Sequence, residues 1–414
     1  MARGLLSGFR ALDLTDEKGF VCGKILASMG VDTIKVEKPG GDPARNLPPF
    51  YGHTPDPEKS LYWLVYNTDK RGITLNLETN RGQELFKELV KRSDFVLESF
   101  TPGYLDDLGL GYEALSGVNP RIIMTSITPF GQKGPYSRYK GGELVASAMS
   151  GVLLSNGYED RAPVKEALDA NYFHANAAAA LGTIMAHYHR EATGEGQQVD
   201  VSAQEVGASR NTNNIIAYQF DRRFLMRSGQ SRRLGINAHR WIWPVRDGYV
   251  FWNMMPGKVG APANRALSQW MDDDGMENPL NKVKDWERLD REGLNQEKRK
   301  VWERAIGLFF ENHTKKEIAD EGRRRGINAC VANDPSDVVK HPQLKARDYW
   351  VELNYPKLGA AAPRYGKHFF LSSDTENYIR LAAPLIGEHN SEIYGGELGL
   401  SDAEIEYLND TNII

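Results

Sequence analysis

Residues 9–36, FRALDLTDEKGFVCGKILASMGVDTIKV, contain the pattern that decides the fold. Phe9–Leu14 is a short apolar run typical of a buried strand. Phe20–Met29 has the spacing of a helix that stops before Gly30, and Asp32–Val36 has the pattern of a second strand. A strand, a helix and a strand of these lengths form a βαβ unit, in which the two strands pair in parallel. The stretch therefore predicts a parallel sheet covered by helices.

The same alternation continues beyond this unit, with segments bounded by Gly, Pro or Asp. The predicted segments, in chain order, are a strand at 72–77, an amphipathic helix at 81–92, strands at 95–98 and 121–126, an alanine-rich helix at 171–192 and a strand at 198–201. We therefore expect an α/β fold with a doubly wound, Rossmann-like sheet.

The second half of the chain has a different pattern. Two short aromatic runs, 241–243 and 249–252, flank Asp247-Gly248, and this pair favours a tight hairpin turn. The following stretch, 257–325, is helical and highly charged. A strand at 326–331, a short helix at 335–340 and a capped helix at 401–408 complete the predicted elements.

Composition places the chain among ordinary globular proteins. The 414 residues carry 51 basic and 55 acidic side chains, a net charge of -4, which provides no general attraction to nucleic acid or to an anionic membrane. The two cysteines, Cys22 and Cys330, form no disulfide framework and fit a reducing compartment. Because no signal-peptide or membrane-spanning run occurs, we expect a cytoplasmic protein.

Motifs of several common enzyme classes are missing from the sequence. His187 and His189 stand two residues apart on a predicted helix and so point to different faces, and neither a Cys cluster nor HExxH occurs. We therefore expect no metal. A GxxxxGK[ST] loop, a GxGxxG after the first strand and a GxSxG elbow are also absent, which argues against the common nucleotide sites and against a serine hydrolase.

A series of short phrases resembles the class III CoA-transferase family, also called the CaiB/BaiF family. Each phrase is weak by itself, but their order and spacing over nearly the whole chain are specific. The phrases include GFRALDLT at 8–15, GVDTIKVEKP at 30–39, ESFTPG at 98–103, FGQKGPY at 130–136, TGEGQ at 193–197, VDVS at 199–202, HPQL at 341–344 and GEH at 387–389.

This resemblance implies a Rossmann-like large domain linked to a smaller α+β domain, with two such chains interlocked as a dimer. In this chain we expect residues 1–220 to form the large CoA-binding domain and 221–330 the small domain. Residues 331–414 would return to complete the large domain. The resemblance also implies that acyl-CoA, a CoA thioester, is the substrate and that a carboxylic acid accepts the CoA.

Cationic side chains suit the phosphates of CoA because charge-assisted hydrogen bonds to phosphate oxygens are strong. Of the cations in the large domain, Lys38 and Lys140 stand where similar proteins contact CoA. Phe100 is a candidate for packing against the adenine. The full set of candidate CoA-binding residues is Lys38, Arg45, Lys70, Arg71, Phe100 and Lys140.

The family's nucleophile is an aspartate that attacks the thioester carbonyl, and in the family register its position is occupied here by Tyr172. A phenol cannot form the anhydride that the mechanism requires. Asp169 stands about one helical turn earlier and is the candidate substitute nucleophile. An aspartate directly before a helix is also a common N-cap, which is the structural alternative for Asp169.

Three functions remain open. Some family members, such as benzylsuccinate CoA-transferase, combine two homologous subunits, so this chain could be the non-catalytic partner of an aspartate-bearing chain. By analogy, its substrates would be an aromatic succinate and succinyl-CoA. Alternatively, the chain is a self-sufficient transferase that uses Asp169, or a CoA-binding protein. An acyl-CoA racemase is disfavoured, because its His and Asp positions fall on Gly142 and Tyr172, although His174 lies nearby.

Overall fold

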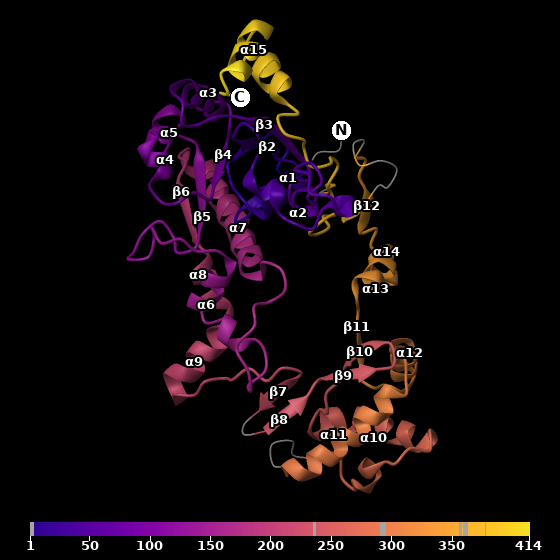
Figure 1. Ribbon diagram of the computed structural model, residues 1–414. Helices are drawn as coiled ribbons and strands as arrows, with labels where there is room; N and C mark the ends of the chain where they lie inside the picture. The colour runs from indigo at the N-terminus through magenta and orange to yellow at the C-terminus, as the bar shows by residue number, and fades with distance from the viewer. Residues whose placement is uncertain (1–3, 235–236, 290–294, 356–357, 359–362, 377) are drawn as a thin grey trace. The chain divides into compact units, whose positions relative to one another are not determined.

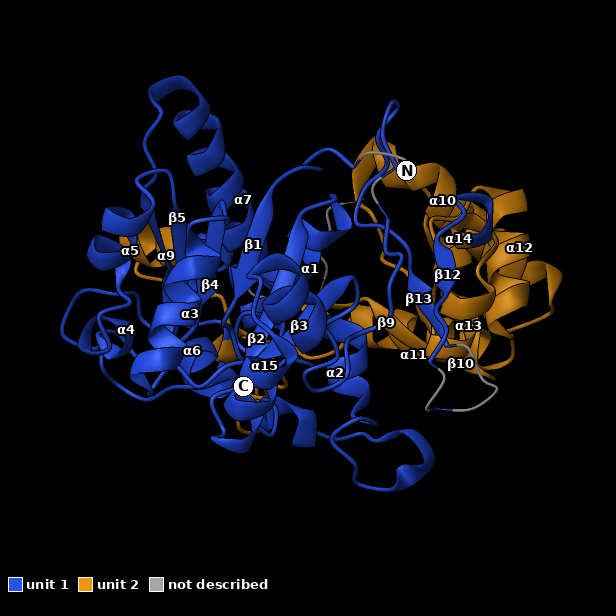
Figure 2. Ribbon diagram, turned by 90° about the horizontal axis from the view of Figure 1, so that it is seen from above, with its two compact units in different colours: residues 1–152, 166–212, 345–414 blue, residues 153–165, 213–344 orange. Residues whose placement is uncertain are grey.

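The computed structural model describes all residues except 1–3, 235–236, 290–294, 356–357, 359–362 and 377 (Figure 1). The chain divides into two compact units (Figure 2). Unit 1 comprises residues 1–152, 166–212 and 345–414, and unit 2 comprises 153–165 and 213–344. The C-terminal segment therefore belongs to the same unit as the N-terminal βαβ motif.

Unit 1 is built on a six-stranded parallel sheet, which confirms the predicted α/β class. The strand order is β3-β2-β1-β4-β5-β6, in which the chain winds from β1 toward one edge and from β4 toward the other. The strands are β1 (Arg10–Asp13), β2 (Asp32–Glu37), β3 (Lys70–Thr74), β4 (Phe95–Glu98), β5 (Ile123–Thr128) and β6 (Gln198–Ser202).

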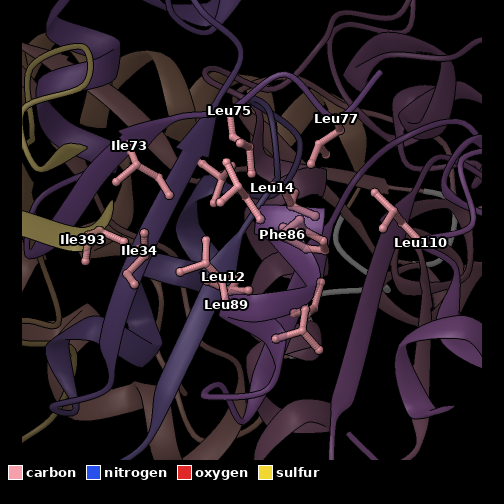
Figure 3. Close-up of a cluster of buried hydrophobic side chains, with 14 of the residues drawn as sticks. Leu12, Leu14, Ile34, Ile73, Leu75, Leu77, Phe86, Leu89, Leu110 and Ile393 are labelled. Carbon is pink, nitrogen blue, oxygen red and sulfur yellow. The ribbon is translucent and has the colours of Figure 1, made fainter. Parts of the chain in front are cut away.

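Helices pack apolar side chains on both faces of this sheet. On one face, α1 (Phe20–Ser28) and α7 (Ala170–Thr193) enclose a core of small and aliphatic residues. The other face packs against α3 (Asn80–Val90), α5 (Tyr112–Val118) and the C-terminal α15 (Asp402–Asp410). Figure 3 shows the second core, in which side chains from β1, β2 and β3 meet Phe86 and Leu89 of α3.

The remaining elements of unit 1 are shorter. They are α2 (Leu61–Tyr66), α4 (Tyr104–Asp107), α6 (Glu143–Met149), α8 (Ala203–Arg210), β12 (Trp350–Glu352) and β13 (Arg364–Gly366). A π-helical turn follows at Ser391–Glu397. The predicted capping box of α15 is confirmed, since Ser401 and Glu404 bond each other's backbone N–H groups.

The C-terminal segment is fastened to the sheet by an ion-pair network. Arg71 on β3 contacts Asp32 on β2 at 2.6 Å, and it contacts Glu392 and Glu397 of the returning segment at 2.7 Å each. Arg10 on β1 adds a contact of 2.6 Å to Glu397. These contacts join residues from opposite ends of the sequence within unit 1.

The core of unit 2 combines a small antiparallel sheet with three of the unit's helices. The predicted hairpin is confirmed as β9 (Ile242–Val245) and β10 (Gly248–Phe251), and β11 (Cys330–Ala332) pairs with β10. Trp243, Trp252, Trp302 and Phe309 are buried in its core. The helices are α10 (Gly257–Asp273), α11 (Gln296–Glu311) and α12 (Lys315–Arg325).

The other elements of the second half are α9 (Thr212–Asp221), β7 (Ser231–Leu234), β8 (Asn237–Arg240), α13 (Pro335–Lys340) and α14 (Pro342–Ala346). Helices α9 and α14 cross the boundaries between the two units. Within the described ranges, no helix combines the length and apolar character that a membrane crossing requires.

Candidate functional site

The strand order of the sheet reverses between β1 and β4, so a ligand site is expected at the carboxyl ends of these two strands. These strands are neighbours, but the chain leaves them in opposite directions, and ligands of doubly wound folds bind in the crevice at such a point. A cavity of about 630 Å³ lies at this edge of the sheet. Its walls come from the segments that follow β1, β2, β3 and β4 and from Asn412 near the C-terminus.

Two of the predicted CoA-binding residues, Lys38 and Phe100, line this cavity together. Lys38 follows β2 and is exposed, and the half-buried Phe100 follows β4 with its ring centroid 4.8 Å from that of Tyr104. The Phe100 backbone N–H donates to Glu98 at 2.8 Å. Burial raises the pKa of Glu98 to about 7. A cation and an aromatic pair therefore share one cavity.

The other side of the cavity is acidic. Asp16 and Glu17 follow β1 and contribute to the lining. Asp16 accepts a hydrogen bond of 2.7 Å from the Ser99 hydroxyl, which bridges the ends of β1 and β4, and it also pairs with Lys18. These residues were missed in the sequence, although their place directly after the first predicted strand was a usable signal.

A second cavity, of about 260 Å³, is lined by Pro102 and Gly103 among other residues. Gln132, Lys133 and Arg138 from the glycine-rich segment contribute to its lining. Gly103 has φ +94°, and a Cβ atom built on it would lie 3.4 Å from the Arg138 guanidinium. Lys133 and Arg138 are further exposed cations that sequence analysis did not single out.

Three of the predicted CoA-binding cations are held by carboxylates of unit 1. Arg45 is fully buried, contacts Glu37 at 2.6 Å and Glu58 at 2.8 Å, and stacks on Trp63. Lys70 is also buried and contacts Asp13 at 2.7 Å.

Arg71 belongs to the network that fastens the C-terminal segment. The fifth predicted cation, Lys140, lies exposed in the loop before α6.

The first turn of α7 is held by a carboxylate from another helix. Glu143, the first residue of α6, accepts from the backbone N–H of Asn171 at 3.0 Å and from that of Tyr172 at 2.9 Å. The Ser147 hydroxyl donates a further bond of 2.9 Å to Glu143. This buried carboxylate satisfies N–H groups that a helix start leaves without an intrahelical partner.

Tyr172 lies inside unit 1, with only 4% of its surface exposed. It belongs to the core between the sheet and helices α1 and α7. Its hydroxyl oxygen has no hydrogen-bond partner among the described residues. Burial raises the pKa of this phenol, and the charges of Asp16 and Glu143 raise it further, so the hydroxyl stays protonated at neutral pH.

Asp169 occupies the N-cap position of α7, but the expected capping role is wrong for its side chain. The N–H groups of Asn171 and Tyr172 donate to Glu143 and not to Asp169. Asp169 instead accepts from the Tyr62 hydroxyl at 3.4 Å. His174 is exposed, with Nδ1 placed 2.6 Å from the carbonyl oxygen of Ala170.

Removal of the Glu143 carboxylate should weaken the start of α7. Glu143→Ala leaves the buried N–H groups of Asn171 and Tyr172 without acceptors, so we expect a loss of about 1–3 kcal/mol in the free energy of unfolding. Denaturant unfolding followed by circular dichroism measures this loss. Glu406→Ala, at an exposed position of α15, is the control and should change stability by less than about 0.5 kcal/mol. Equal stabilities of the two variants would show that Glu143 does not hold this helix.

Within the described part of the chain, no group of three or more His, Cys, Asp or Glu side chains is placed to hold a metal ion. The polar side chains that line the two cavities include cations, carboxylates, amides and hydroxyl groups.

Comparison with known proteins shows the family to which the chain belongs. The chain is 35% identical over 408 residues to the BbsE subunit of succinyl-CoA:(R)-benzylsuccinate CoA-transferase from Thauera aromatica, covering 97% of this chain and 96% of that protein. It is 30% identical to a formyl-CoA:oxalate CoA-transferase from Streptomyces avermitilis, covering 99% of both chains.

Solved structures agree with these sequence relatives. A CaiB/BaiF family protein from Brucella suis superimposes with a TM-score of 0.81 at 25% identity, covering 95% of this chain and 99% of that one. The sequence model of CoA-transferase family III matches residues 6–390. The relatives are named as CoA-transferases, and this chain belongs to CoA-transferase family III.

Proposed function

We propose that this chain is the non-catalytic subunit of an acyl-CoA:carboxylate CoA-transferase and that a homologous chain supplies the attacking aspartate. The single observation that carries the proposal is Tyr172. From the resemblance to the family we expect the nucleophile at this position, and the side chain found there is a buried, protonated phenol. A phenol cannot form the acyl anhydride from which an aspartyl-CoA thioester arises.

In this proposal CoA binds in the crevice of unit 1, as part of the large domain expected from the sequence. Lys38 and Phe100 line the larger cavity, where the ring can pack against a base and the cation can bind a phosphate. Lys133 and Arg138 border the neighbouring cavity, and Lys140 follows on the same segment. The chain would interlock with its partner as members of this family do, which makes exchange of subunits slow.

The acyl donor and acceptor are proposed by analogy. The Thauera aromatica relative is named as a subunit of an enzyme that uses succinyl-CoA and (R)-benzylsuccinate. We therefore propose succinyl-CoA as donor and an aromatic succinate as acceptor. Other relatives are named for oxalate and D-citramalate, so the test must include a panel of acids.

Transfer by this chain alone, through Asp169, is the second candidate. One observation favours it: the carboxylate of Asp169 does not cap α7, because Glu143 takes that role. If Asp169 is the nucleophile, Asp169→Asn should abolish transfer by the isolated chain and a CoA thioester should map to its peptide. Unchanged turnover of that variant would remove Asp169 from the mechanism.

Purification from the native source tests the proposal for a partner. Native mass measurement should show this chain together with a second, homologous chain of similar size, and activity should require both. A homogeneous preparation of this chain with full activity would refute the proposal.

Lys38 should contribute to CoA binding. Lys38→Met removes a cation from the cavity while retaining a side chain of similar length, so we expect CoA affinity to fall about tenfold, the cost of one charge-assisted hydrogen bond. Isothermal titration calorimetry with CoA measures this. Lys91→Met, at the exposed C-cap position directly after α3, is the control and should leave the affinity unchanged. If Lys38→Met and Lys91→Met bind CoA with equal affinity, Lys38 does not contact the CoA phosphates.

A further inference from the structure

The walls of the larger cavity carry more negative than positive charge. Among the described residues that line it, Lys38 is the one lysine or arginine. The carboxylate side chains in the same lining are Asp16, Glu17, Glu37, Asp42 and Glu78. Because like charges repel, the phosphates of CoA are disfavoured over most of this surface. Hydrogen-bond donors of a ligand are favoured there instead.

Most of these carboxylates are balanced by cations of the chain itself. The ion pairs are Asp16–Lys18, Glu37–Arg45 and Asp42–Lys35. Neither Glu17 nor Glu78 forms such a pair with a described residue, and both are exposed. The carboxylates of Glu17 and Glu78 are therefore the two in this cavity that a ligand can most readily contact.

Glu78 lies beside the aromatic pair of the cavity. The Tyr104 hydroxyl donates to Oε1 of Glu78 at 3.3 Å, and the centroid of the Tyr104 ring is 4.8 Å from that of Phe100. All three side chains line the cavity. Each carboxylate oxygen can accept more than one hydrogen bond, so Glu78 retains acceptor capacity for a ligand.

The position of Glu78 is set by the turn that follows β3. Its backbone N–H donates to the side-chain oxygen of Asn76 at 3.1 Å, and the backbone N–H of Asn76 donates to the carbonyl of Ile413 at 2.7 Å. The next residue, Thr79, is the N-cap of α3 and accepts from the N–H of Gly82 at 3.0 Å. The chain thus presents this carboxylate beside the ring pair before any ligand binds.

The chemistry of a carboxylate restricts which edge of a base it can receive. A base that packs against Phe100 comes within reach of Glu78, because the Tyr104 ring contacts both residues. An exocyclic amino group on that base is a donor, and a carboxylate accepts from it in a charge-assisted hydrogen bond. A carbonyl oxygen at the same place would meet only repulsion. Adenine, the base of CoA, carries such an amino group.

We infer that Glu78 accepts a hydrogen bond from the exocyclic amino group of the adenine of bound CoA and determines the specificity of the site for this base. The inference rests on the proposed function, because it requires CoA in the crevice of unit 1. It adds the residue that distinguishes the base of the ligand. Glu78 acts on the nucleotide end of CoA, so its role is independent of which acyl group is transferred.

Titration calorimetry with two ligands tests the inference on the full chain, together with its partner where the two copurify. The ligands are CoA and an analogue whose base is unsubstituted purine, which lacks only the amino group. The wild type should bind CoA roughly tenfold more tightly than the analogue, the cost of one charge-assisted hydrogen bond. Glu78→Met has similar length but no carboxylate, so it should bind the two ligands with nearly equal affinity. Glu78→Gln retains a neutral acceptor and should keep an intermediate preference.

The ratio of the two affinities is the readout, because removal of a negative charge from the cavity strengthens the binding of both phosphorylated ligands. Glu84→Met, at an exposed position of α3 outside the cavity lining, is the matched control and should keep the wild-type ratio. Both methionine variants should unfold at the same denaturant concentration as the wild type, because both side chains are exposed.

A wild-type chain that binds CoA and the purine analogue equally, or a Glu78→Met variant that keeps the wild-type ratio, would overturn the inference and leave the proposed function standing. Failure of the wild-type chain to bind CoA at all would overturn the proposed function and the inference with it, and the wild-type titration alone shows that case.

Discussion

If the proposed function is right, replacement of Tyr172 by aspartate should give this chain a covalent CoA-transfer activity. The resemblance to the family implies that the nucleophile belongs at this position, which lies in the first turn of α7. Loss of a catalytic nucleophile typically costs several orders of magnitude in rate, so its restoration should raise transfer on the order of 100-fold or more above the wild-type background. The measurement is transfer of CoA from succinyl-CoA to a panel of carboxylic acids, together with peptide mapping of the aspartyl-CoA adduct.

This substitution also carries a cost to stability. It removes a buried ring, which by itself costs about 3–5 kcal/mol, although the start of a helix favours the negative charge that is gained. Tyr172→Asn is therefore the matched control, because it has nearly the shape of aspartate but cannot attack a thioester. Both variants should lose similar stability, and only the aspartate should gain activity. If the folded aspartate variant binds succinyl-CoA and is as inactive as the asparagine variant, the assignment of position 172 is wrong.

Lys70→Met should produce a large loss of stability, although Lys70 is a candidate CoA-binding residue. Lys70 and Asp13 are both fully buried and lie 2.7 Å apart. Burial by itself would raise the pKa of Asp13, but Lys70 and Lys35 hold it below its ordinary value. Without Lys70 the buried carboxylate loses its nearest cation, and breaking such a pair costs about 3–5 kcal/mol.

Chemical denaturation gives the free energy of unfolding of Lys70→Met and of the double variant Asp13→Asn/Lys70→Met. Comparison of the two values shows what the ion pair contributes to stability. The double variant should recover part of the loss, because the uncompensated charge is gone. A ligand role for Lys70 predicts the opposite pattern, in which Lys70→Met unfolds like the wild type and binds CoA more weakly. The two results distinguish a cation that stabilises the sheet from one that binds a phosphate.

The sheet of unit 1 could be predicted because its central strands are short apolar runs between clear breaks. Phe95–Glu98 was predicted with the bounds that β4 has. The strand expected at Gly72–Leu77 begins earlier, at Lys70, since Lys70 and Arg71 are paired with carboxylates across the sheet. Hydropathy does not reveal that a charged residue has found a buried partner.

A similar limit applies to the strand expected at Gly326–Val331. Gly326 has φ 73° and ends α12, so β11 starts only at Cys330. The residue type alone does not show whether a glycine between two elements ends a helix or begins a strand.

The site was less accessible to sequence reasoning than the sheet. Lys38 and Phe100 share a cavity because both follow strands of a parallel sheet, and the order of the strands makes those ends meet. Glu143 accepts hydrogen bonds from the start of α7 because α6 packs beside that helix. No local sequence pattern around Gly142 predicts this contact. The sequence predicts that Tyr172 stands where the family has its nucleophile, but it does not reveal that the Tyr172 hydroxyl lacks a hydrogen-bond partner among the described residues.

We propose that this chain contains no carboxylate able to attack an acyl-CoA, and mass spectrometry of the isolated chain tests this claim most directly. The purified chain is incubated with succinyl-CoA and quenched, and its peptides are searched for acyl or CoA adducts on aspartate and glutamate. We predict no adduct on any peptide, including the one that contains Asp169. A CoA thioester on a carboxylate of this chain, formed at a rate that matches turnover, would contradict the claim.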